Sequence, residues 1–309
     1  MSPEPPTSTA TVPTWREVAP EVLTTFRTIE SVAARSVPAT IGAPVRAAIG
    51  AILGVPPGER IEVAADARTA ACVQFAEQFV VDVAGLTDDQ RNSMMAAMGN
   101  DAFAFVQFVY VADVFTRARI AIEMLFGDRL EAIDSVDPLD ADSGAGDALW
   151  PLLERFMQQV ALLSALDPLT TELVRLRGAQ VHNCRLCQSR RSVKALDAAP
   201  DAAVFEHITA DNPDLTERER VALALADALV TQPRSIDAGL ITAVHAHFDV
   251  AAITEIVYDV ARNAANKIAV ALGGDAPVVS EGVEFYDIDE SGDVVADVDI
   301  DVVRGATAR

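Results

Sequence analysis

The chain has 309 residues and a formal net charge of −22 at pH 7. A nucleic-acid backbone would repel so acidic a protein, which excludes direct nucleic-acid binding from the expected functions. Half of the residues are apolar but only 6% are aromatic. The abundance of alanine and leucine, two strong helix formers, predicts an all-α fold.

The first residues, "MSPEPPTSTATVPTW", lack the basic region and the apolar segment of a signal peptide. No run of about 18 apolar residues is present, so we expect no transmembrane helix and no membrane partner. These observations predict a cytoplasmic protein. In that compartment a close pair of cysteines is more often catalytic or metal-binding than a structural disulfide.

In chain order, residues 1–14 are rich in Pro, Ser and Thr and are predicted to be disordered. Residues 15–135 form an N-terminal helical region with long apolar faces, and Thr87 before "DDQR" is a predicted N-cap. Residues 136–146 are small and acidic and predict a linker.

Residues 147–274 predict a second helical domain. Asp167 followed by Pro168 predicts a helix start, and Thr216 with Glu219 has the spacing of a capping box. The segment "VAAITEIVYDVARNAANKIAVALGG" predicts one long amphipathic helix that ends at glycine.

Residues 275–309 form an acidic tail in which apolar and acidic residues alternate around "ESGD", a pattern that predicts a β-hairpin. Four of its residues resemble the start of an EF-hand loop, but Val298 stands where the bidentate glutamate belongs. These four are Asp287, Asp289, Ser291 and Gly292. A solvated acidic strand face explains the same residues, and we expect no bound metal.

The motifs "LTDDQR" (86–91) and "LTERER" (215–220) both precede helical patterns. One interpretation is a duplicated helical unit with a degenerate first copy. The other is that threonine followed by acidic residues is a common way for a helix to begin.

The segment "VHNCRLCQSRRS" (181–192) carries two of the three cysteines. Asn183 predicts an N-cap that would place Cys184 at the first helical position and Cys187 one turn later. Free N–H groups and the helix dipole at such a position lower the pKa of a thiol. Three nearby arginines would add positive charge: Arg185, Arg190 and Arg191.

Two structural alternatives compete with a redox pair. Zinc needs about four ligands, whereas the pair and His182 supply three and no second C-x-x-C exists. Two inert buried thiols would fit isolated cysteines, but the polar neighbours disfavour that interpretation here. Cys72, which has no partner nearby in the sequence, is predicted to be a buried apolar residue.

Glu172, eleven intervening residues and the C-x-x-C of Cys184 and Cys187 are similar to the signature of the carboxymuconolactone decarboxylase and alkylhydroperoxidase D-like family. The resemblance covers roughly residues 147–273. It implies a helical bundle that assembles into a homo-oligomer and acts as a thiol peroxidase without a cofactor or metal.

The resemblance also implies residue roles. Cys187 would attack a hydroperoxide and become a sulfenic acid, and Cys184 would resolve it as a disulfide, which a dithiol protein would reduce. Glu172 would be the base end of a proton relay. Arg191 and Leu186 stand where the peroxidases carry histidines, and an arginine cannot shuttle a proton.

In a supporting role, Arg191 could stabilise the Cys187 thiolate, and His182 could replace part of the relay or be an ordinary loop histidine. Two further functions stay open: a redox-sensing or interaction protein on the same scaffold, and a cofactor-free decarboxylase. The decarboxylase branch of the family does not rely on a cysteine pair, which makes it the weaker expectation.

Overall fold

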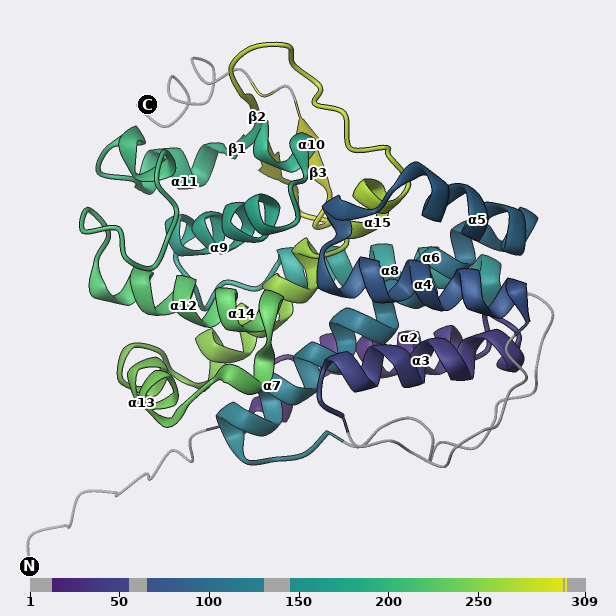
Figure 1. Ribbon diagram of the computed structural model, residues 1–309. Helices are drawn as coiled ribbons and strands as arrows, with labels where there is room; N and C mark the ends of the chain where they lie inside the picture. Colours follow the sequence, from purple (N-terminus) through teal and green to yellow (C-terminus); the bar gives the residue numbers. More distant parts are fainter. Residues whose placement is uncertain (1–12, 56–65, 131–144, 297, 299–309) are drawn as a thin grey trace, which may run out of the picture.

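The computed structural model describes residues 13–55, 66–130, 145–296 and 298 (Figure 1). It is predominantly helical, with a small three-stranded sheet near the C-terminal end of the described chain. The helical prediction is therefore confirmed. The predicted disorder of residues 1–14 and the predicted linker 136–146 fall largely outside the described residues, and Ala145 already opens a helix.

The described residues of the first half, from Trp15 to Phe126, are helical apart from short connections. Thr87 caps its helix as predicted, in a capping box with Gln90. The elements are α1 (Trp15–Val18), α2 (Pro20–Ala33), α3 (Ala39–Ile52), α4 (Ala67–Val81), η1 (Val83–Gly85), α5 (Asp88–Met98), η2 (Gly99–Asp101), α6 (Ala102–Tyr110), η3 (Val111–Phe115) and α7 (Thr116–Phe126).

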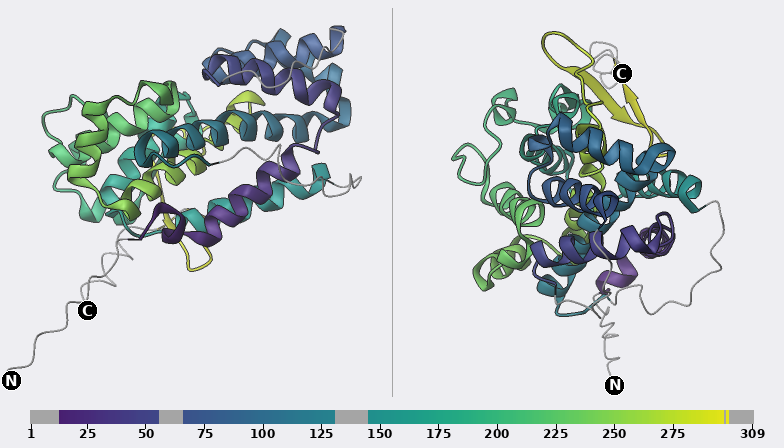
Figure 2. Two further views of the ribbon diagram at one scale, coloured as in Figure 1. Left: turned by 90° about the horizontal axis from the view of Figure 1, so that it is seen from below. Right: turned by 45° about the vertical axis from the view of Figure 1, so that its right-hand side comes forward.

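The run from α5 to α7, Asp88–Phe126, is long and apolar enough by length and composition to cross a membrane. A core helix of a globular protein meets the same criteria. Here the α6–α7 part lies between other helices of the fold (Figure 2), and Phe105, Phe108 and Phe115 are fully buried. In this structure the α6–α7 part of the run serves as a core helix.

The second half carries the caps that the sequence predicts. Asp167 caps a helix that starts at Pro168, and Thr216 forms a capping box with Glu219. The elements are α8 (Ala145–Ala161), α9 (Pro168–Val181), α10 (Arg185–Gln188), α11 (Val193–Ala198), η5 (Ala202–Phe205), α12 (Glu217–Thr231), η6 (Pro233–Ser235), α13 (Ala238–His247), α14 (Val250–Asn263) and α15 (Asn266–Ala271). The predicted single long helix is wrong, because it breaks into α14 and α15.

The same order of elements occurs in both halves. A 15-residue helix (α4 or α12), a three-residue 3-10 turn (η1 or η6), a helix of 11 or 10 residues (α5 or α13) and a largely buried helix (α6 or α14) follow one another, with η2 inserted before α6. α3 packs on α4 as α9 packs on α12. The "LTDDQR" and "LTERER" motifs do not mark this repeat, because the first caps α5 and the second caps α12. For these motifs, the common helix start is the interpretation that fits.

One hydrophobic core joins the two halves. At its centre Arg117 of α7 is buried and donates hydrogen bonds to carbonyls in the last turns of both 15-residue helices, Val80 on α4 and Val230 on α12. The buried carboxylate of Asp113 pairs with Arg117 and also with Lys267 of α15. Elements from the two halves are therefore tied at one charged centre.

The sheet consists of β1 (Arg190–Ser192), β2 (Glu284–Ile288) and β3 (Val294–Ala296). β2 and β3 pair antiparallel around a turn, which confirms the predicted hairpin for this part of the tail. β1 was not predicted, and it pairs parallel with β2 in the register Arg191 to Phe285. This pairing places the tail against the cysteine segment (Figure 1).

Candidate redox site

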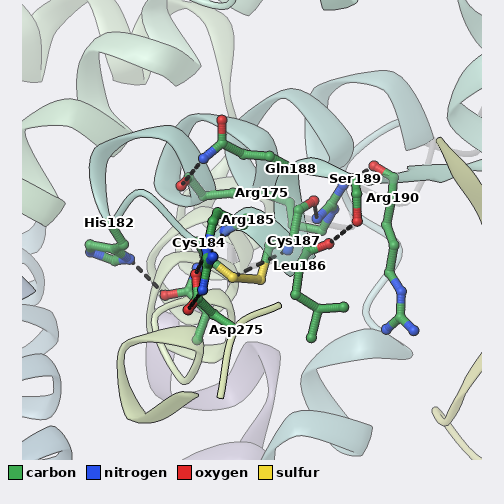
Figure 3. Close-up of a disulfide and its surroundings, with 12 residues drawn as sticks. Arg175, His182, Cys184, Arg185, Leu186, Cys187, Gln188, Ser189, Arg190 and Asp275 are labelled. Carbon is green, nitrogen blue, oxygen red and sulfur yellow. Dashed lines mark hydrogen bonds and ion pairs between the residues drawn. A yellow bond between two sulfur atoms is a disulfide. The ribbon is translucent and has the colours of Figure 1, made fainter. Parts of the chain in front are cut away.

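Cys184 and Cys187 lie at disulfide distance, with their Cα atoms 5.3 Å apart (Figure 3). Cys184 is fully buried, whereas Cys187 is only half-buried. The backbone N–H of Cys187 donates to the Sγ of Cys184 at 3.2 Å. The two sulfurs can therefore exchange a disulfide in place, and Cys187 is the one that solvent reaches more readily.

The predicted capping of this segment is wrong by one residue. Asn183 has a positive φ of 49° and lies outside the helix, and Cys184 itself is the N-cap of α10. Because α10 has only four residues, its dipole is small, since the macrodipole is a sum over aligned peptide units. Among the described residues, one hydrogen-bond donor reaches a sulfur of the pair: the Cys187 N–H, which donates to the Sγ of Cys184 and not to that of Cys187.

The predicted positive surroundings are also largely neutralised. Arg185 forms a salt bridge with Asp275, and Arg190 forms one with Glu284. Asp275 is buried, and the hydrogen bond from the Arg185 side chain lowers the pKa of its carboxyl. Both acids come from the tail, so a carboxylate that stays ionised lies next to Arg185, the first of the two residues between the cysteines.

The two positions at which the peroxidases carry histidines have structural roles here. Leu186 packs against the core, and its N–H donates to the carbonyl of Asp275. Arg191 lies in β1 and is half-buried; its Nη1 donates to the carbonyls of Gln188 and Arg190, and burial lowers the pKa of its guanidinium. Neither side chain has a hydrogen bond to a cysteine sulfur within the described part of the chain.

Glu172 is 2% exposed, and both of its oxygens are hydrogen-bonded. The Nε and Nη2 atoms of Arg175 both donate to Glu172 at 2.7 Å. Glu172 also accepts hydrogen bonds from the Tyr286 hydroxyl and from the Ser192 N–H. Arg175 then donates to the carbonyl of Cys187 at 2.9 Å. The structure thus connects Glu172 to Cys187 through an arginine and the backbone.

His182 is the C-cap of α9 and is buried. Its Nδ1 lies 2.8 Å from Oδ1 of Asn266, and its ring points away from the disulfide (Figure 3). Burial, helped by the nearby Lys267, lowers the pKa of His182 to about 3. The ring is therefore neutral at physiological pH and belongs to the charged centre of the core.

Cys72 is buried and free, as predicted, and burial raises the pKa of its thiol to about 11. Such a thiol is a poor nucleophile.

Four residues of the site were not predicted: Arg175, Asp275, Glu284 and Tyr286. The i, i+3 spacing of Glu172 and Arg175 on one helix was a usable signal for an ion pair. The other three come from the tail, about 90 or more residues from their partners. No local pattern encodes such contacts.

Comparison with known proteins identifies relatives by sequence. The chain is 40% identical over 229 residues to the uncharacterized proteins Rv2313c and MT2376 from two strains of Mycobacterium tuberculosis, a match that covers 73% of this chain and 80% of each relative. It is 34% identical over 95 residues to the uncharacterized protein YnjA of Escherichia coli, covering 30% of this chain and 52% of that protein. No protein-family model and no solved structure matches the chain.

Proposed function

The chain belongs to the family of the mycobacterial protein Rv2313c, and from its own site we propose that it is a thiol-dependent oxidoreductase resembling alkylhydroperoxidase D. It would reduce hydroperoxides through a dithiol and disulfide cycle of Cys187 and Cys184. One observation carries the proposal: a half-buried cysteine and a fully buried cysteine lie at disulfide distance on one helical turn.

In the first step the Cys187 thiolate attacks the outer oxygen of a hydroperoxide, the O–O bond breaks, and the products are a Cys187 sulfenic acid and an alkoxide that takes up a proton. The Cys184 thiol then displaces hydroxide from the sulfenic sulfur, giving the disulfide and, with the thiol proton, one water. A dithiol protein restores both thiols and is itself oxidised to a disulfide. The exposure of the two cysteines supports this order of attack.

The alkoxide needs a proton. Leu186 cannot supply one, Arg191 is held by carbonyls, and Glu172 is held by Arg175 and Tyr286. Solvent is therefore the proposed proton source, and we expect slower turnover than in a peroxidase with a histidine next to the thiol. Glu172 and Arg175 would act by fixing the Cys187 backbone.

We propose that the fold consists of two copies of an alkylhydroperoxidase D-like helical bundle, with the cysteines in the second copy. The repeated order of α4, η1, α5 and α6 in α12, η6, α13 and α14 supports it. By the same resemblance the protein would be a homo-oligomer, and by its sequence pattern we propose that it acts in the cytoplasm.

A stopped-flow peroxide assay with dithiothreitol as reductant tests the activity. We expect Cys187→Ser to abolish peroxide consumption. Cys184→Ser, treated with peroxide in the absence of dithiothreitol, should stop at a sulfenic acid that dimedone traps. Peroxide consumption that survives Cys187→Ser would overturn the proposal. Arg191→His is the gain-of-function control, because it restores a titratable group at a position where the peroxidases have one.

A redox sensor is the second candidate, favoured by the contacts between the cysteine segment and the tail. Asp275 binds Arg185 and Leu186, and Glu284 binds Arg190. Reduction of the disulfide would alter these contacts between the cysteine segment and the tail. A change in size or tail protection between oxidised and reduced protein, without peroxide turnover, would favour this function.

A further inference from the structure

A cavity of about 400 Å³ lies between the α8–α9 connection, α14 and the hairpin of β2 and β3. Small-molecule sites have this size, with mostly apolar walls and a few polar groups. One wall is apolar and includes Leu162, Leu163 and Leu166. Residues 286–290 of β2 and the start of the hairpin turn line another side.

Two carboxylates of α14 line the cavity one helical turn apart, Glu255 and Asp259. Glu255 accepts a hydrogen bond from the N–H of Ala165 at 2.6 Å. Asp259 is 1% exposed, and its Oδ2 is buried without a hydrogen-bond partner among the described residues. A buried carboxyl oxygen without a partner is costly, so a donor at this point of the cavity would be strongly favoured.

The residues that line the cavity include more acidic than basic side chains. Glu172 is paired with Arg175, and Asp287 is paired with Lys194. Within the described lining this leaves one further cation, Arg262, whose Nε donates to the carbonyl of Met157. The remaining acids of the lining are Glu255, Asp289 and Glu290, and Asp259 adds a further negative charge when it loses its proton. A ligand that balances this lining carries positive charge.

We propose that this cavity binds a small organic cation, a primary ammonium on an apolar body, with Asp259 as its counter-ion. The ammonium would donate the hydrogen bond that Asp259 Oδ2 lacks. The apolar part of the ligand would pack against the leucines of the apolar wall. The described residues contain no group of three or more metal-ligating side chains, which favours an organic cation over a metal ion.

The cavity is separate from the disulfide. Arg175 contacts both, because it lines the cavity and its Nη1 donates to the Cys187 carbonyl. Glu172, Arg175 and Tyr286 of the redox site also line the cavity, so the two sites share a wall. The proposed ammonium site uses Asp259 and needs no step of the thiol chemistry.

Calorimetric titration of the full chain with n-hexylamine, hexanoate and 1-hexanol tests the proposal. We expect saturable binding of the amine and much weaker binding of the acid and the alcohol. Burial raises the pKa of Asp259 to about 8, so the free protein holds a proton there at pH 7. Binding of an ammonium would release up to one proton per site, which an indicator dye detects in weakly buffered solution.

Asp259→Asn keeps the shape of the side chain and should weaken hexylamine binding by about tenfold or more, with loss of the proton release. The exposed Glu154→Gln changes the net charge equally and should bind as wild type. Thr171→Trp, which fills the cavity from α9 without changing charge, should also abolish binding. Wild-type affinity in Asp259→Asn, or tighter binding of hexanoate than of hexylamine, would overturn the proposal.

Discussion

Asp275 binds Arg185 through both the backbone and the side chain: Oδ2 accepts from the Arg185 N–H at 3.1 Å, and Oδ1 accepts from its Nη2 at 2.8 Å. Arg185 directly follows the buried cysteine of the pair. The tail thereby places the negative charge of Asp275 beside the thiols. It also holds the guanidinium of Arg185, the nearest cation, in a salt bridge, so that Arg185 cannot turn toward the sulfurs. Both effects disfavour a thiolate.

Asp275→Asn should therefore lower the pKa of the reactive thiol, by about one unit. The change removes a like charge and frees the Arg185 guanidinium to face the sulfurs. The rate of iodoacetamide alkylation of the reduced protein, measured against pH, reports this pKa. Glu281→Gln is the matched control, because Glu281 is an exposed acid of the same tail. A thiol pKa that is equal in both variants would contradict the role given to Asp275.

The three cysteines should react in the order Cys187, Cys184, Cys72. Cys187 is half-buried and Cys184 fully buried, while Cys72 is buried with a pKa raised to about 11. Brief alkylation of the reduced protein at pH 8, followed by peptide mass spectrometry, gives the order directly. Labelling of Cys184 before Cys187 would instead make the first cysteine the nucleophile and reverse the two roles.

The helices and their caps were predictable because their signals are local. Thr87, Asp167 and Thr216 cap helices at the predicted residues, since each cap depends on a few neighbouring positions. The break between α14 and α15 was not predicted, because the sequence there carries no proline or glycine. It lies where Lys267 turns inward to reach Asp113, a contact across 154 residues.

The site was predictable only in part. The C-x-x-C spacing placed the two sulfurs together, as the structure has them. The count of arginines around the pair suggested a positive field, but Glu284 and Asp275 neutralise two of them from the tail. β1 was missed because three residues with two arginines carry no strand pattern of their own, and only pairing with β2 makes them a strand.

Gly292→Ala should displace the hairpin turn from α8. Gly292 has a φ of +87°, and an added Cβ would overlap the Gln158 backbone. We expect a loss of stability of roughly 1–3 kcal/mol and faster hydrogen exchange over β2 and β3. Gly282→Ala is the matched control: its φ is +76°, but no atom lies within 4 Å of the added Cβ. Equal exchange in the two variants would show that the contact with Gln158 does not hold the turn.

Asp259 should make the protein less stable as the pH rises. Its folded pKa is raised to about 8 by burial, above its unfolded value of about 3.9. Its contribution is therefore fully present below about pH 4 and is lost as the pH rises toward 8. Urea unfolding at pH 5, 7 and 9 should show wild type falling relative to Asp259→Asn across this series. Parallel curves for the two proteins would show that Asp259 does not hold a proton in the fold.

The parallel pairing of β1 with β2 has a consequence for biosynthesis. Arg190 and its partner Glu284 are 94 residues apart, so the ribosome releases the cysteine segment well before the strand that holds it. A nascent chain therefore carries Cys184 and Cys187 without Asp275 beside them. During synthesis the thiols would be more acidic and more open to oxidation than in the finished protein.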